Sequence, residues 1–205
     1  HWWSQSQRWC CRRWSCSSEI SPAKDWCVIM IIMMGVAGVG KSIQGRAVAD
    51  TLALPWLSTG EFLRMMISGD RRRKMLDGHL LEDEEIIELA DKIFHMIDVK
   101  EEFILDGFPR TLAQADWLLA QHKTGLIDIS CVILLEASQD VVTERLLARG
   151  RPDDTAEAID KRFKEYEVVT LPIISDLEQK GISVHRIDGA RSPEDVQSDV
   201  LAALQ

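Results

Sequence analysis

Long apolar runs are missing from this 205-residue sequence. A membrane-spanning helix needs about 20 predominantly apolar residues in a row. The longest candidate, CVIMIIMMGVAGVG at residues 27–40, is interrupted by glycines and leads directly to Lys41. Positive charge is also scarce, with 24 Lys and Arg against 33 Asp and Glu and a net charge of -9. Because nucleic acids and anionic membrane surfaces attract basic proteins, we predict a soluble chain with no nucleic-acid and no membrane partner.

Cysteine is sparse and has no metal-binding pattern. None of the five cysteines forms a CxxC pair, and Cys10, Cys11 and Cys16 have only His1 as a nearby histidine. This argues against the alternative that these three cysteines are metal ligands or reactive thiols. These three lie in the first 26 residues with five of the seven tryptophans and no helix or strand periodicity. No apolar segment there has the length of a secretion signal. We therefore interpret residues 1–27 as a disordered or artefactual leader, and Met30 could begin the complete domain.

Nothing in the sequence suggests disulfides. Cys131 lies in the apolar run CVILLEA and is predicted to be a buried core residue. A chain without disulfides fits a reducing compartment, so the predicted location is the cytoplasm.

The chain does contain an alternation of short apolar runs and helical patterns. Buried parallel strands form short continuous apolar runs joined by crossovers of about a dozen residues or more, and the spacers here are long enough. We therefore predict one α/β domain at residues 28–205, with a doubly wound, five-stranded parallel sheet between two helical layers. The predicted strands are residues 28–34, 54–58, 103–105, 130–135 and 183–187.

Local signals place several helices. Ser58 stands three residues before a glutamate as in a capping box, and Ser192 precedes a proline at the first helical position. Residues 82–97 repeat apolar side chains every three or four positions, which predicts a helix with one buried face. A longer helical pattern at 154–180 contains Pro172, so we expect a kink or break at the residue before it.

The stretch GVAGVGKS at residues 35–42 satisfies the phosphate-loop pattern G-x-x-x-x-G-K-[ST], with an apolar strand before it and a helical pattern after it. Its glycines let backbone N–H groups approach phosphate oxygens, and the following helix adds positive charge at its amino end. Lys41 would contact the outer phosphates, and the Ser42 hydroxyl suits Mg²⁺. This predicts a nucleoside triphosphate site; the alternative is a glycine-rich turn with a solvated lysine.

Four further stretches indicate what accepts the phosphoryl group. They are STGEFLR at 58–64, GHLLEDE at 78–84, ILDGFPRTLAQAD at 104–116, and RPDD at 151–154 followed by Arg162. With the phosphate loop, they resemble the adenylate kinases from about Met30 to the carboxyl end. The resemblance implies a Mg²⁺-dependent monomer that equilibrates ATP plus AMP with two ADP. It also implies a three-layer P-loop kinase core with a small acceptor-binding insert at 58–82 and a short lid at 149–154.

The resemblance implies a role for each matching residue, with Gln114 reading the adenine edge of AMP and Arg64 and Arg110 holding its phosphate. The implied ATP-binding set is Gly35, Gly38, Val39, Gly40, Lys41, Ser42, Ile43, Arg145, Arg149 and Arg191. The implied AMP-binding set is Thr59, Arg64, Met75, Leu80, Leu81, Gly107, Phe108, Pro109, Arg110, Gln114, Arg151 and Arg162. The implied catalytic residues are Lys41, Asp106, Arg110, Arg149, Arg151 and Arg162, and the implied Mg²⁺ ligands are Ser42 and Asp106.

Residue spacing bears on the same site. Asp106 closes an apolar strand, where a carboxylate reaches the crevice at the strand's carboxyl end and can hold Mg²⁺ through waters. Arg145 and Arg149 stand four residues apart and so share a helix face. Arg162 follows Arg151 by eleven residues, or three helical turns, which could aim both side chains inward. The alternative is a strand cap for the carboxylate and a solvated helix face for the arginines.

The sequence departs from the family around the phosphate loop, where Ser42 and Ile43 stand in place of the usual glycine and threonine. This leaves open a related small-molecule kinase that acts on a sugar acid. Thr111 and Gln114 match the AMP-binding form, whereas relatives acting on UMP or CMP commonly have Asn after DGFPR, so a UMP/CMP kinase is another alternative. A chain that had lost transfer would be a non-catalytic nucleotide sensor.

The lid is the larger departure. Only Gly150 separates Arg149 from Arg151, where even compact relatives have several residues. The lid has no cysteine, which excludes the zinc-bearing lid of some relatives. The short segment between Arg64 and Gly78 predicts a small acceptor insert. We therefore expect weaker exclusion of water from the site and looser nucleotide choice.

Overall fold

A five-stranded parallel sheet forms the centre of the molecule, as predicted. The computed structural model describes residues 28–77, 81–96 and 102–205; the predicted leader lies outside these residues. The strands are β1 (Val28–Met34), β2 (Trp56–Ser58), β3 (Phe103–Asp106), β4 (Ile127–Glu136) and β5 (Val184–Asp188). Their order in the sheet is β2-β3-β1-β4-β5, and every pairing is parallel.

Strand β1 shows why the sheet is covered on both faces. Successive side chains of a strand point to opposite faces, and here Met30 and Ile32 enter one buried cluster while Ile31 and Met33 enter another. An apolar side chain at every position therefore needs a helical layer on each side. The predicted core residue Cys131 of β4 is buried in the second cluster.

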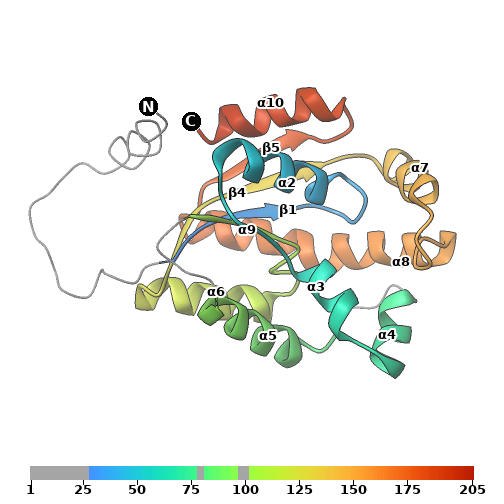
Figure 1. Ribbon diagram of the computed structural model, residues 1–205, viewed down its shortest axis with the longest axis horizontal. Helices are drawn as coiled ribbons and strands as arrows, with labels where there is room; N and C mark the ends of the chain where they lie inside the picture. Colours follow the sequence, from blue (N-terminus) through green and yellow to red (C-terminus); the bar gives the residue numbers. More distant parts are fainter. Residues whose placement is uncertain (1–27, 78–80, 97–101) are drawn as a thin grey trace, which may run out of the picture.

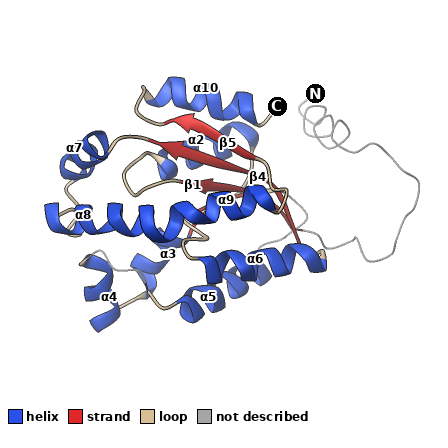
Figure 2. Cartoon of the chain, turned by 180° about the vertical axis from the view of Figure 1, so that it is seen from behind, coloured by secondary structure: helices blue, strands red, loops and turns tan. Residues whose placement is uncertain are grey.

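The helices form those two layers. Apolar residues on one face of the sheet are covered by α2 (Lys41–Leu52), α7 (Gln139–Arg149), α8 (Ala156–Glu165) and α10 (Pro193–Ala203). The other face is covered by α5 (Asp83–Met96), α6 (Leu112–Thr124) and α9 (Leu171–Gln179). Helix α9 lies behind the strands in Figure 1 and in front of them in Figure 2. No helix within the described ranges combines the length and apolar character that a membrane crossing requires.

Two short helices, α3 (Thr59–Met66) and α4 (Gly69–Leu76), fill the segment between β2 and α5. They lie at the edge of the sheet layers in Figure 1. The predicted cap of α3 is present, since the Ser58 hydroxyl accepts a hydrogen bond from the Glu61 N–H at 3.4 Å. The predicted cap of α10 is present too, since Ser192 accepts from the Asp195 N–H at 3.2 Å.

The predicted break before Pro172 takes the form of a π-helical turn. Helix α8 ends at Glu165, the π segment η1 covers Tyr166–Thr170, and α9 begins at Leu171 with Pro172 in its first turn. The Leu171 N–H donates to the Tyr166 carbonyl five residues back. A proline interrupts the i→i−4 ladder of a helix, and here the wider turn carries the chain past it without leaving helical geometry.

The strand order fixes where a ligand can bind. Strand β1 lies between β3 and β4, so the chain proceeds from the middle of the sheet to one edge and then to the other. In open parallel sheets of this kind, the crevice at the carboxyl ends of the strands near this reversal is the binding position. The glycine loop after β1 and Asp106 at the end of β3 both lie there.

Candidate functional site

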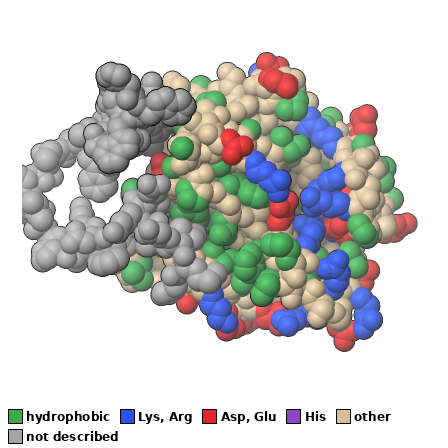
Figure 3. All heavy atoms as spheres, in the orientation of Figure 1, with side chains coloured by type: hydrophobic (Ala, Val, Ile, Leu, Met, Phe, Trp, Pro, Cys, Tyr) green, Lys and Arg blue, Asp and Glu red, His purple; other side chains and the backbone are tan. Residues whose placement is uncertain are grey.

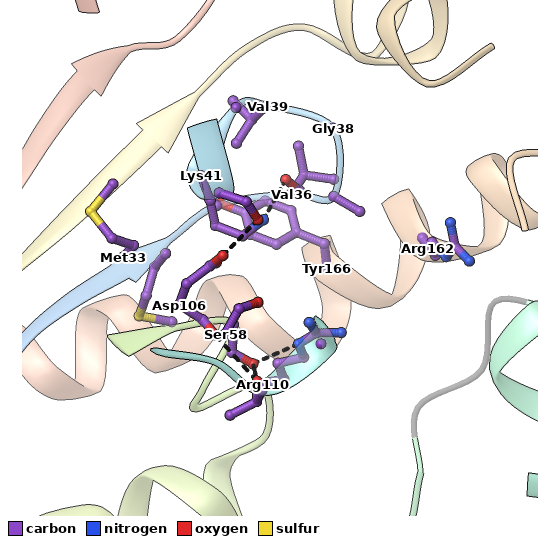
Figure 4. Close-up of a pocket in the computed structure, with 18 of the residues that line it drawn as sticks. Met33, Val36, Gly38, Val39, Lys41, Ser58, Asp106, Arg110, Arg162 and Tyr166 are labelled. Atoms are coloured by element: carbon purple, nitrogen blue, oxygen red, sulfur yellow. Dashed lines mark hydrogen bonds between the residues drawn. The ribbon is translucent and has the colours of Figure 1, made fainter. Parts of the chain in front are cut away.

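One cavity of about 630 Å³ opens at the carboxyl ends of β1 and β3. Its wall includes every site residue predicted from the sequence within the described ranges, and Leu80 lies outside those ranges. Figure 4 shows Lys41 and Arg110 entering this space from opposite sides of Asp106. On the face of the molecule seen in Figure 3, Lys and Arg side chains gather in the right half, where α3, α4, α7 and α8 lie in Figure 1.

The phosphate loop depends on glycine at three points. Gly35, Gly38 and Gly40 have φ angles of 138°, 90° and 114°, in the region that side chains disfavour. Gly35 also lies against β4, because a Cβ there would stand 2.3 Å from the Leu135 carbonyl oxygen. Gly40 precedes α2 and has no side chain to cap it, the first turn of α2 contains no acidic residue, and the amino end of α2 lines the cavity. Such an end attracts anions.

Lys41 is folded back over this loop. Its Nζ donates to the Val36 carbonyl at 2.8 Å. Burial lowers the pKa of Lys41 from 10.5 to about 8; Asp106 raises it, and the positive charges of Arg110 and Arg149 lower it further. Keeping Lys41 protonated in this cavity therefore costs free energy, and an anion that enters the cavity would offset that cost.

Ser42 and Asp106, which come from different parts of the sequence, are in contact. The Ser42 hydroxyl donates to Asp106 Oδ2 at 2.7 Å. Asp106 is the last residue of β3, is 2% exposed, and pairs in register with Met33 of β1 and Ser58 of β2. The parallel register therefore places its carboxylate at the start of α2, beside the phosphate loop.

Arg110 and Arg64 occupy the wall opposite the loop. Arg110 Nε donates to the Gly107 carbonyl at 2.8 Å, and Thr59 Oγ1 donates to the same carbonyl at 2.9 Å. Burial lowers the pKa of Arg110, Asp106 opposes this, and Arg64 and Arg162 lower it further. Cations gathered in this way at a cavity wall form a site for an anion.

Two adjacent carboxylates, Asp153 and Asp154, bind three arginines of the cavity wall and were not predicted as site residues. Asp153 Oδ2 accepts from Arg64 at 3.1 Å and from Arg162 at 2.6 Å. Asp154 binds the Arg149 guanidinium with both oxygens, at 2.8 and 2.6 Å. Burial pushes the pKa of Asp153 upward, but the hydrogen bonds and charges of Arg64 and Arg162 outweigh it, and the pKa lies below its ordinary value. The signal in the sequence was the pair of aspartates directly after RP.

The helical-spacing argument for Arg151 was wrong. Helix α8 begins only at Ala156, with Thr155 as its cap, and residues 151–154 form a turn closed by the Asp154 N–H donating to the Arg151 carbonyl at 2.9 Å. Proline and two aspartates after Arg151 favour a turn over a helix interior. Arg151 still lines the cavity, and its side chain lies 3.7 Å from a carboxylate oxygen of Glu61 on α3.

Arg145 connects the phosphate loop with the loop after β5. Its guanidinium donates to the carbonyls of Gly189 at 2.6 Å, Ala190 at 3.0 Å and Arg191 at 3.3 Å, and also to that of Val39 at 3.3 Å. It shares the inward face of α7 with Arg149, as predicted from their spacing. The loop after β5 is thereby held at the rim of the cavity.

Gln114 also lines the cavity. Its side chain is 2% exposed; Oε1 accepts from the Arg110 N–H at 2.8 Å, and Nε2 donates to Asp83 Oδ1 at 2.8 Å. The predicted apolar residues Met75, Leu81 and Phe108 line the same cavity, together with the unpredicted Leu63 and Ile86. The role of Asp83 was not predicted, because an acidic residue at the start of a helix is ordinary.

Comparison with known proteins finds the family that the sequence motifs resemble. The adenylate kinase family model matches residues 33–182. Adenylate kinase of Prochlorococcus marinus is 37% identical over 182 residues, which cover 85% of this chain and 97% of that protein. Adenylate kinase of Xylella fastidiosa is 35% identical over 187 residues, covering 85% of this chain and 98% of that protein. For adenylate kinase of Corynebacterium urealyticum the identity is 34% over 180 residues, which cover 85% of this chain and 98% of that protein.

Proposed function

The chain belongs to the adenylate kinase family, and we propose on that premise that it reversibly transfers the γ-phosphoryl group of ATP to AMP, giving two ADP. The observation that carries this proposal is the presence of two cationic sets in one cavity. The loop at 35–42 with Lys41 forms one wall. Arg110 stands on another wall in Figure 4, and Arg64 lines the same cavity. A protein that only bound a triphosphate would need only the first set.

Transfer between two nucleotides requires alignment and charge neutralisation. The attacking oxygen of a nucleoside monophosphate is already ionised, so no general base is needed, and stabilisation falls to cations around the in-line path. We infer that Lys41 contacts the phosphates of ATP and that Arg110 orients the phosphate of AMP. Arg149, Arg151 and Arg162 would stabilise the charge that spreads over the transferring group. Ion pairs with carboxylates hold these three side chains at the cavity wall, which supports this role.

Mg²⁺ is the metal that the donor set fits. Hard divalent cations prefer oxygen ligands, and Mg²⁺ is usually held by one or two carboxylates, waters and substrate phosphates. The Ser42 hydroxyl and the Asp106 carboxylate are already in contact at 2.7 Å. The described part of the chain holds no cluster of three or more His, Cys, Asp or Glu side chains suited to a metal, which agrees with an ion shared with substrate. When bound, the ion would neutralise phosphate charge.

We further propose that residues 58–82 bind the acceptor and that residues 149–154 act as a short lid, on a core at 28–205 that works as a cytoplasmic monomer. Helices α3 and α4 support the first assignment, because they carry Arg64 and Met75 to the acceptor side of the cavity. The contact between Arg64 and Asp153 supports the second, because it joins the insert to the lid turn without substrate.

The test is ADP formation under Mg-ATP with AMP, CMP, UMP and gluconate as separate acceptors. AMP should give the highest kcat/KM. A preference for CMP or UMP would refute the choice of acceptor, and phosphorylation of gluconate alone would support the sugar-acid kinase. Nucleotide binding without transfer to any acceptor would support the sensor and refute the kinase.

A further inference from the structure

The amide group of Gln114 is gripped on both of its polar atoms. Oε1 accepts a hydrogen bond from the Arg110 N–H at 2.8 Å, and Nε2 donates one to Asp83 Oδ1 at 2.8 Å. The side chain is 2% exposed and lines the cavity. An amide oxygen can accept two hydrogen bonds and an amide nitrogen can donate two. Gln114 therefore keeps one acceptor position and one N–H for a ligand.

These two contacts decide which way round the amide lies. Turned over, it would set Nε2 against the Arg110 N–H and Oε1 against the carboxylate of Asp83. Donor would then meet donor and acceptor would meet acceptor, in a buried place where an unpaired polar group costs about 1–3 kcal/mol. Only one orientation satisfies both neighbours, so the remaining acceptor and donor have fixed positions.

The groups that grip Gln114 are themselves held. Thr111 Oγ1 donates to the same oxygen of Asp83 at 2.7 Å, which joins the start of α6 to the start of α5. On the other side, Thr170 Oγ1 of the π turn donates to the Arg110 carbonyl at 2.9 Å. The Arg110 backbone is thus hydrogen-bonded through both its N–H and its carbonyl, and α5, α6 and η1 all contribute to the orientation of one amide.

We propose that Asp83 is a positioning residue for base specificity: by fixing the Gln114 amide, it makes the acceptor site select a 6-aminopurine over a 6-oxopurine. This rests on the proposed function, in which the monophosphate base lies beside Gln114. Asp83 is not part of the cavity wall and acts only through Gln114. A side chain with a free choice of orientation would accept either base.

The chemistry of the two bases gives the discrimination. Adenine presents an N–H donor at C6 beside a ring-nitrogen acceptor, which matches the acceptor and donor of a single amide. A 6-oxopurine such as hypoxanthine presents an acceptor at C6, which would face the Gln114 oxygen. A site built to hydrogen-bond one pattern rejects the other strongly, because its buried polar groups are left unpaired.

The experiment measures equilibrium binding of AMP and of IMP by calorimetry, with a non-hydrolysable ATP analogue filling the donor site. Wild type is compared with Asp83→Ala and Asp83→Asn. We expect wild type to prefer AMP by about 100-fold or more, and Asp83→Ala to reduce that preference about tenfold or more. Asp83→Asn keeps an oxygen that can accept from both Thr111 and Gln114, so it should stay within about threefold of wild type.

Glu84→Ala is the matched control, since it removes an exposed carboxylate from the same first turn of α5. It should leave the AMP preference unchanged. If Asp83→Ala does not fold, Asp83→Ser replaces it, because serine is polar but too short to reach Gln114.

A purely structural role for Asp83 would weaken AMP and IMP binding by the same factor and leave the preference intact, which would overturn the proposal. Equal binding of the two nucleotides by wild type would overturn it as well, as would an equal loss of preference in Glu84→Ala. Turnover is measured separately: absence of ADP formation from AMP refutes the proposed function, whereas these binding ratios refute only the role of Asp83.

Discussion

Replacing Lys41 with methionine should make the protein more stable while abolishing its proposed activity. Methionine keeps the length of the side chain but carries no charge. Burial lowers the pKa of Lys41 from 10.5 to about 8, so the folded protein carries an unfavourable buried charge at neutral pH. Sites arranged to bind substrate are often destabilising without it. The stability of the variant therefore reports directly on the electrostatics of the phosphate loop.

The magnitude follows from the pKa difference. At about 1.4 kcal/mol per pH unit, the fall from 10.5 to about 8 corresponds to roughly 3 kcal/mol. Loss of the hydrogen bond to the Val36 carbonyl costs about 1 kcal/mol, and water in the cavity reduces the gain further. We expect Lys41→Met to be about 1–2 kcal/mol more stable at pH 7, or about 2–8 °C higher in Tm for a domain of this size.

The pH dependence gives the sign an independent check. Below pH 8 the lysine is protonated in both the folded and the unfolded chain, so wild type bears the full cost. Between pH 8 and 10.5 the folded protein has released the proton and the unfolded chain has not, so wild type gains stability as the pH rises. The gap between Lys41→Met and wild type should therefore shrink above pH 8.

The assay is urea denaturation of both proteins at pH 7 and pH 9 without nucleotide. Lys123→Met is the control, because Lys123 is exposed in the last turn of α6; its change should be within about 0.5 kcal/mol at both pH values. A Lys41→Met protein that is less stable than wild type at pH 7 would refute the reasoning. So would a gap that stays constant between the two pH values.

Three further substitutions test the site. Arg110→Ala should lower kcat with AMP by about 100-fold or more with little loss of folding, and retained turnover would contradict its clamp role. Ser42→Ala should raise the Mg²⁺ concentration needed for half-maximal rate several-fold with an unchanged circular dichroism spectrum, and an unchanged requirement would exclude its hydroxyl as a ligand. Gly35→Ala should cost more than about 2 kcal/mol on urea denaturation, because its Cβ would stand 2.3 Å from a carbonyl oxygen at a φ of 138°. Gly125→Ala is its control, because Gly125 has a φ of 78° and an added Cβ would have no atom within 4 Å. An equal loss of stability in both variants would show that the close contact at Gly35 has no effect.

The elements predictable from the sequence are those whose signal is local. Strand β1 was predicted with its observed bounds, because seven apolar residues run directly into a glycine loop. The caps at Ser58 and Ser192 depend on residues three positions away and were also found. The edge strand β2 is two residues shorter than predicted, and the edge strand β5 is shifted by one residue. Pairing with a neighbouring strand decides where a strand stops, and a local sequence pattern does not contain that information.

The site was predictable where a motif fixes a residue's place and not where distant residues meet. Asp153 contacts Arg64, which is 89 positions away in the chain, and no spacing rule reaches so far. The grip of Asp83 on Gln114 crosses 31 positions and joins two helices. The error over Arg151 arose because a helical period was extended through a turn whose proline and aspartates disfavour it.

Carboxylates and carbonyls already occupy the positions around which phosphates would gather. Asp153 contacts Arg64 and Arg162, Asp154 contacts Arg149, and Lys41 rests on the carbonyl of its own loop. These contacts give each partly buried cation a partner inside the cavity, where a charge without one would be costly. Binding a phosphate there therefore exchanges an internal partner, a carboxylate or a carbonyl, for the phosphate, so the net affinity is much smaller than the sum of the contacts formed. The same exchange lets products leave, because each cation that loses a phosphate has an internal partner to return to.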